Sequence, residues 1–90
     1  MQQQDYKILQ FNQALAKVTK QLRETQKISA NKLTNEYELG SGNLSRIENA
    51  VYNCKFITIW KVSEALGLKF SEFSKFLEDE LGDDFKLIDE

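Results

Sequence analysis

Apolar side chains recur at three- and four-residue intervals along most of this chain, and that spacing places them on one face of successive α-helices. The longest stripe comprises Ile8, Phe11, Leu15, Val18 and Leu22. Further stripes occur in residues 29–39, 44–51, 56–66 and 70–81, and Phe56 and Trp60 in the fourth are expected in the core. Proline is absent and glycine occurs only four times, which favours helix. The predicted fold class is all-α, a compact bundle of about five helices in one domain, residues 1–90.

Capping residues and glycines predict where these helices begin and end. Asp5 and Ser29 can cap the first two helices through their side-chain oxygens, and Gly67 can end the fourth. The segment Gly40-Ser41-Gly42 separates the second and third helices by a tight turn. Residues 29–53 are therefore predicted to form a helix-turn-helix, a unit whose second helix can enter the major groove of DNA.

The composition argues against an enzyme. Histidine is absent and cysteine occurs once, so histidine-based acid/base catalysis, an intrachain disulfide and the usual zinc ligand sets are excluded. No cofactor or metal is expected, and Cys54 is expected to be a small loop residue. A lone cysteine without a leader segment is typical of a reducing cytoplasm. No apolar run approaches the roughly 18 residues that a membrane-spanning helix needs, so no membrane partner is expected.

Charge is distributed unevenly along the chain. The net charge is −2, although residues 1–28 carry +3 and residues 29–69 carry +1. Residues 70–90 carry −6, so the acidity is confined to the C-terminal end. Because Lys and Arg supply most of the affinity of proteins for the phosphate backbone, the weakly basic first part of the chain remains compatible with DNA as a partner.

Residues 29–73, half of the chain, resemble the Cro/CI-like (XRE) helix-turn-helix regulators of bacteria and phages, aligned without a gap. Residues 22–24 and 28–29 also match the end of that family's first helix and the approach to its second. The matching positions are Leu33, Leu39, Leu44-Ser45-Arg46-Ile47-Glu48 and Ala65-Leu66-Gly67-Leu68.

The resemblance implies a lambda-repressor-like fold and a sequence-specific DNA-binding transcriptional regulator, acting as a repressor dimer on a palindromic operator. It also implies a structural ion pair between Arg23 and Glu48, which would hold the third helix against the first. Four positions depart from the family pattern. Ala30 replaces a phosphate-contacting glutamine, Glu38 replaces the turn glycine, Ala50 replaces the glycine after the reading helix, and Cys54 replaces a proline. These departures affect the details of DNA contact more than the apolar framework.

With Leu44 and Ile47 turned inward, helical geometry sends the intervening side chains of the third helix outward. Arg46 can donate two hydrogen bonds to guanine, and Asn43 can pair with adenine. Ser41 and Gly42 stand at the helix start, where the family contacts bases. The predicted phosphate contacts are Lys32, Lys55, Lys27 and Lys20. For each residue the alternative is an ordinary solvated side chain, and Asn43 can equally cap the helix.

The helix predicted at 70–81 carries more apolar bulk than one small core needs, which suggests a partner surface. The predicted homodimer surface is Phe70, Phe73, Phe76, Leu77 and Leu81, assisted by the end of the first helix that carries Ile8 and Phe11. The alternative is that the stripes of the first and last helices pack on each other within one chain.

Three types of regulator fit the sequence: a phage-type repressor, a restriction-modification controller and the antitoxin of a toxin–antitoxin pair. An antitoxin would need a protein partner, for which the acidic tail is a candidate. A different class also fits, a protein-interaction module with weak or lost DNA binding. The negative net charge, Ala30 and the missing side chain of Gly42 favour that alternative.

Overall fold

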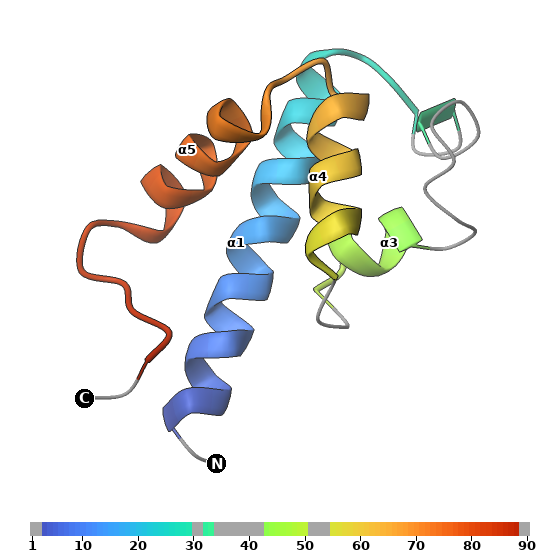
Figure 1. Cartoon of the computed structure of the whole chain (residues 1–90). Helices are drawn as coiled ribbons and strands as arrows, with labels where there is room; N and C mark the ends of the chain where they lie inside the picture. The colour runs from blue at the N-terminus through green and yellow to red at the C-terminus, as the bar shows by residue number, and fades with distance from the viewer. Residues whose placement is uncertain (1–2, 30–31, 34–42, 51–54, 89–90) are drawn as a thin grey trace.

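The structure is a computed structural model that describes residues 3–29, 32–33, 43–50 and 55–88. These residues form four α-helices and no strand, α1 (Gln3–Thr25), α3 (Asn43–Glu48), α4 (Phe56–Ala65) and α5 (Phe70–Leu81) (Figure 1). The predicted all-α class is confirmed for this part of the chain. Lys32 and Leu33 are helical, but most of the predicted second helix falls on residues 30–31 and 34–42, outside the described residues.

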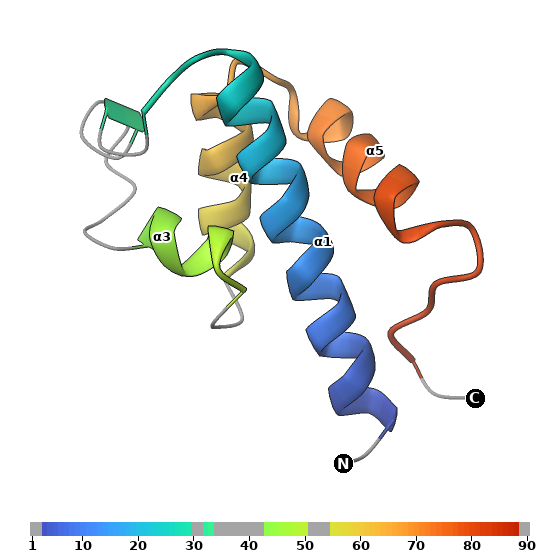
Figure 2. The ribbon, with the colours of Figure 1, turned by 180° about the vertical axis from the view of Figure 1, so that it is seen from behind.

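The long helix α1 is the element on which the others are assembled. Its 23 residues span about 34 Å at 1.5 Å per residue, most of the 41 Å long dimension of the molecule. α3 and α5 pack on opposite sides of α1, and α4 lies beside α1 and contacts α5 (Figures 1 and 2). The start of α1 and the segment that follows α5 lie near the same end of the molecule (Figure 1). This arrangement gives α3 and α5 separate outward faces.

The core is built from the predicted apolar stripes. Leu33, Leu44 and Phe73 are at most 1% exposed, so residues distant in sequence meet at the centre. Phe11 and Leu22 of the α1 stripe pack at its edge. The buried cluster comprises Ala14, Leu15, Val18, Leu33, Leu44, Ile47, Val62, Ala65, Leu66, Phe73 and Leu77. Burial of these side chains is the main force that holds the helices together.

Two of the three predicted helix-end signals are confirmed. The hydroxyl of Ser29 accepts a hydrogen bond from the Lys32 amide at 3.1 Å, as an N-cap does. Gly67 has φ +77°, and its amide donates to the Glu64 carbonyl at 2.9 Å while the Leu68 amide donates to the Ser63 carbonyl at 3.0 Å. This pair of bonds is the Schellman arrangement.

The prediction for Asp5 was wrong. α1 begins at Gln3, so Asp5 lies within the first helical turn and is not the N-cap. α5 has the bounds that its apolar stripe predicted.

The prediction that Phe56 and Trp60 are core residues was also wrong. Phe56 is 61% exposed and Trp60 is 44% exposed. Four apolar side chains fall within five positions at the start of α4, more than one helix face can bury. Val62 and Ala65 take the buried face, while Phe56 and Trp60, one turn apart, remain outside it.

The predicted dimer surface on α5 is partly contradicted. Phe73 and Leu77 are 0% and 8% exposed, because they face α1 within the same chain. Leu81 packs against the core cluster, and Ile8 and Phe11 are half-buried. Phe70 is half-buried and Phe76 is 47% exposed. Intrachain packing therefore accounts for most of that stripe, which was the alternative interpretation.

The end of α3 leads to a stability prediction. Ala50 has φ +56°, a left-handed conformation that costs a residue with a Cβ about 1–2 kcal/mol. Its amide donates to the Ile47 carbonyl at 3.1 Å. Ala50→Gly should remove this strain. Glycine also gives the unfolded chain more conformational freedom, which lowers the free energy of unfolding by about 0.4–1 kcal/mol. We expect the free energy of unfolding to rise by about 1 kcal/mol, measured by denaturant titration.

Gln13→Gly provides the matched control, because Gln13 is exposed in the middle of α1. That substitution should lower the free energy of unfolding by about 1 kcal/mol. If Ala50→Gly lowered the free energy of unfolding as much as Gln13→Gly does, Ala50 would not be strained.

Candidate nucleic-acid interface

α3 is a six-residue helix whose orientation is fixed by two buried side chains. Leu44 is 1% exposed and Ile47 is 2% exposed, and both join the core cluster. Because residues three apart share a helix face, this anchoring turns Ser45 and Arg46 outward, and both are exposed. The sequence pattern thus positions Arg46 on the solvent side of a short helix.

The predicted ion pair between Arg23 and Glu48 is present and locks α3 to α1. Arg23 Nε donates to Glu48 Oε2 at 2.7 Å, and Nη2 donates to Oε1 at 3.0 Å. The remaining guanidinium nitrogen Nη1 donates to the carbonyl of Ile28 at 2.9 Å. The two side chains are only 14% and 10% exposed. A bidentate pair of this kind fixes both distance and orientation.

Two residues are therefore held by one guanidinium, through three hydrogen bonds. Glu48 ends α3, and Ile28 lies just beyond α1, where its amide donates to the Arg23 carbonyl at 3.2 Å. The hydrogen bond with Glu48 raises the pKa of Arg23 above its ordinary value, an effect that desolvation opposes. Because the raised pKa favours the charged form, the stabilisation is fully present below the ordinary pKa of arginine and is lost only at more alkaline pH.

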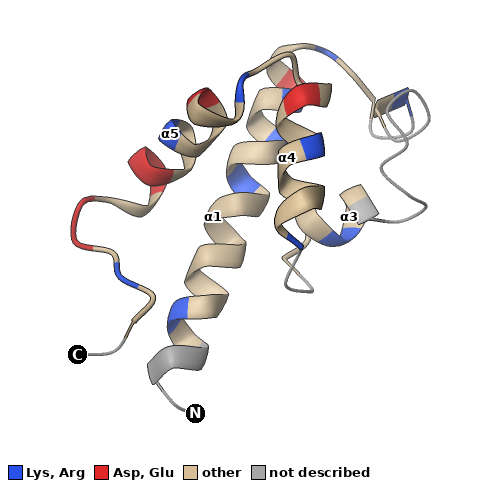
Figure 3. Cartoon of the chain, viewed as in Figure 1, with Lys and Arg blue, Asp and Glu red and all other residues tan. Residues whose placement is uncertain are grey.

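The ion pair also shapes the charge of the α3 face. Glu48 is the only carboxylate of α3, and Arg23 neutralises it on the inward side. Carboxylates gather instead on α5 and on the segment that follows it, whereas the α3 side shows basic residues (Figure 3). A phosphate backbone approaching α3 would therefore not meet a carboxylate of that helix.

The predicted base-contacting residues are only partly described. Ser41 and Gly42 lie outside the described residues. Asn43 is the first residue of α3, and its side chain also lies outside the described part. Arg46 is exposed near the middle of the helix. Asn49 is exposed too, but its Nδ2 donates to the carbonyl and hydroxyl oxygens of Ser45 at 2.8 and 3.3 Å, so it stabilises the end of α3.

The four lysines predicted to contact phosphate are all exposed. Lys20 precedes Arg23 by three residues on α1, so it lies toward the side of α1 that holds α3. Lys27 follows the end of α1 with φ +59°, and Lys32 follows the Ser29 cap. Lys55 immediately precedes α4. They come from four separate places along the chain, and Lys20 is the one that shares the helix face of Arg23.

An exposed aromatic cluster was missed by the sequence interpretation. The rings of Trp60 and Phe70 are stacked, 4.7 Å apart and 2° from parallel. Phe56 lies 6.1 Å from Trp60 and 5.1 Å from Phe70, and the neighbouring Ile57 is 70% exposed. We call Phe56, Ile57, Trp60 and Phe70 the aromatic cluster. The run of apolar residues all around the first turn of α4 was the signal that could have revealed it.

The rest of the molecule offers no metal centre or membrane span in its described parts. Among those residues, no group of three or more His, Cys, Asp or Glu side chains could hold a metal ion. Within the same residues, no helix has the length and apolar character needed to cross a bilayer.

No protein-family model, curated protein or solved structure matches this chain.

The ion pair leads to a second stability prediction. Arg23→Ala should lower the free energy of unfolding by about 3–5 kcal/mol, because the carboxylate of Glu48 would be left buried without a partner. The double substitution Arg23→Met, Glu48→Leu should recover most of that loss, because no charge is stranded. Thermal and urea unfolding of the three proteins would measure these differences.

The exposed pair Lys75–Asp79, with a 3.8 Å separation and side chains 77% and 69% exposed, supplies the control. Lys75→Ala should change the free energy of unfolding by less than about 0.5 kcal/mol. An Arg23→Ala protein as stable as the wild type would contradict a structural role for the pair.

Proposed function

We propose that this protein is a sequence-specific DNA-binding transcriptional regulator, a repressor of the Cro/CI-like type that acts as a dimer on a palindromic operator. The observation that carries the proposal is the outward presentation of Arg46 on a short helix whose only carboxylate is neutralised by Arg23. The finer fold type, a five-helix lambda-repressor-like bundle, is part of the same proposal. It is supported by the order of the four described helices and by the Ser29 cap that precedes the second predicted helix.

In this proposal α3 enters the major groove, which is wide enough to admit a helix. Arg46 donates two parallel hydrogen bonds to the O6 and N7 atoms of guanine, and Asn43 pairs with adenine. Ser41 contributes a hydroxyl, and Gly42 lets the backbone approach the DNA closely. Lys20, Lys27, Lys32 and Lys55 contact phosphates, which positions the protein without reading sequence.

The test begins with selection of bound duplexes from a random pool, followed by affinity measurements on the enriched sequence. Arg46→Lys keeps the charge but cannot form the bidentate contact. It should weaken binding to the selected site by about 1–3 kcal/mol and leave affinity for random DNA nearly unchanged. Lys75→Ala on α5 is the control and should leave both affinities unchanged.

The regulator would be supported if the selection enriches a palindrome and the Arg46→Lys protein distinguishes that palindrome poorly from random DNA. Lack of affinity for heparin and DNA at low salt would instead favour a protein-interaction module.

The dimer in this proposal uses the aromatic cluster in place of the α5 stripe. Its rings are adjacent, Phe56 and Trp60 are exposed and Phe70 is half-buried, and such apolar patches are typical of partner surfaces. Charged residues of both signs border it, because Glu64 of α4, Lys69 immediately before α5 and Glu72 of α5 line the same surface space as Trp60 and Phe70. A surface that carries both signs can pair with a copy of itself around a two-fold axis. Two copies could then address half-sites about 34 Å apart.

Sedimentation equilibrium tests the dimer. Ile57 is 70% exposed, so Ile57→Asp should leave the fold intact and convert the dimer to monomer by placing a charge in an apolar interface. Ile88 is 75% exposed outside the cluster, and Ile88→Asp should remain dimeric. A wild-type protein that is only monomeric at high micromolar concentration would defeat this part of the proposal.

A second candidate function is supported by the acidic side of the molecule. The −6 charge of residues 70–90 is unsuited to DNA and suited to a basic protein partner. An antitoxin would combine both surfaces, whereas a phage-type repressor or a restriction-modification controller needs the DNA surface and the dimer alone.

A further inference from the structure

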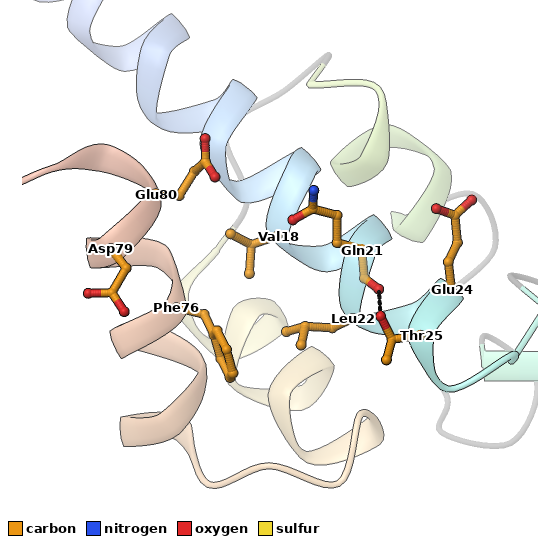
Figure 4. Close-up of a pocket in the computed structure, with 8 residues that line it drawn as sticks. All are labelled: Val18, Gln21, Leu22, Glu24, Thr25, Phe76, Asp79 and Glu80. Atoms are coloured by element: carbon orange, nitrogen blue, oxygen red, sulfur yellow. Dashed lines mark hydrogen bonds between the residues drawn. The ribbon is translucent and has the colours of Figure 1, made fainter.

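A hollow is lined by residues of α1 and α5, whose side chains are drawn in Figure 4. α5 lies on the side of α1 opposite α3 (Figure 1). Its volume is about 700 Å³. Val18 and Leu22 of α1 and Phe76 of α5 form its apolar floor. Phe76 and Leu22 project toward each other across the gap between the two helices (Figure 4). Phe76 is 47% exposed, so the side chains of the described residues do not fill the space.

The rim of the hollow is acidic. Glu24 of α1 and Asp79 and Glu80 of α5 line it, and no Lys or Arg is among the described residues that do so. Glu80 pairs with Lys17 at 3.2 Å, and Asp79 pairs with Lys75 at 3.8 Å. Both lysines are more than half exposed, so these pairs are weak and a partner's cations could replace them. The hollow therefore combines an apolar floor with a negative border.

The hollow continues as a furrow along α1 and α5. A second space, of about 220 Å³, shares Glu80 with the hollow. A third space, of about 390 Å³, shares Gln10 and Leu81 with the second space. The furrow extends from Thr25 to Lys7, about 27 Å of α1 at 1.5 Å per residue. Its second and third spaces are lined by Lys17, Lys7 and Lys86 as well as by Glu80 and Asp84, so the purely acidic border is confined to the first hollow. The Lys17–Glu80 pair stands where the first two spaces meet. This length exceeds what a small molecule fills and matches a helix of about 18 residues.

We propose that this furrow binds an amphipathic helix of a partner protein, apolar along one face and flanked by Lys and Arg. The apolar face would cover Val18, Leu22 and Phe76, as helix-in-groove partners do. The flanking cations would pair with Glu24, Asp79 and Glu80. DNA is excluded as the occupant because the rim carboxylates repel phosphate. Because α3 and α5 lie on opposite sides of α1 (Figures 1 and 2), the partner and DNA can bind together.

The probe is a synthetic peptide of about 18 residues with leucines at three- and four-residue spacing and lysines on both flanks. A second peptide replaces every lysine by glutamate. Fluorescence anisotropy with the full chain should give a micromolar dissociation constant for the lysine peptide and at least about tenfold weaker binding of the glutamate peptide. The affinity for the lysine peptide should fall as salt is added.

Two variants locate the peptide. Phe76→Ala removes the aromatic side chain of the floor, and Asp79→Lys reverses the charge of one of the three rim carboxylates. Each should weaken binding about tenfold. The matched control is Glu78→Lys, the same charge change at an exposed position of α5 that does not line the hollow. It should weaken binding less than about twofold. Circular dichroism of each variant verifies that the helices remain.

Equal weakening by Asp79→Lys and Glu78→Lys would overturn the proposal, because it would show attraction to acidic surface in general. Failure of the lysine peptide to bind at millimolar concentration would overturn it as well. Self-association of the protein that Phe76→Ala abolishes would identify a second copy as the occupant and also overturn it. Arg46→Ala should bind the peptide as the wild type does, so loss of DNA binding and loss of peptide binding are distinguishable.

Discussion

The bidentate contact between Arg23 and Glu48 is the interaction on which the proposed DNA surface depends. α3 has only six residues, and a helix that short does not persist alone in water. Leu44 and Ile47 anchor one face of it in the core, but two apolar contacts leave some freedom of rotation. The guanidinium removes that freedom by holding the end of α3 at 2.7 and 3.0 Å. It also binds the Ile28 carbonyl, so the end of α1 and α3 form one rigid corner.

α1 separates two surfaces of opposite chemistry. α3 presents Arg46 on one side, while α5 and the residues after it present carboxylates on the other (Figure 3). The net charge of −2 therefore describes neither surface. A chain with this division can place phosphate on one side and a basic protein on the other, because a charge that attracts one of these ligands repels the other.

Much of the fold followed from spacing and from residues at helix ends. The stripes predicted the bounds of α5, and Ser29 and Gly67 marked ends that local hydrogen bonds define. The Arg23–Glu48 pair came from the family resemblance, because spacing alone does not say that residues 25 apart meet. The exposure of Phe56 and Trp60 was missed because an apolar residue in a sequence indicates burial but does not show which surface will cover it. Phe73 and Leu77 were misassigned to a dimer surface for the same reason, since the same stripe can pack on α1 or on another chain.

Mapping of backbone amide signals by NMR, during titration with the selected duplex, tests the central claim most directly. If α3 reads DNA from the corner held by Arg23 and Glu48, the largest shifts should fall on residues 43–50, with smaller ones at Lys20, Lys27, Lys32 and Lys55. Residues of α5 should not shift. Shifts concentrated on α5, or none at low salt, would contradict the account.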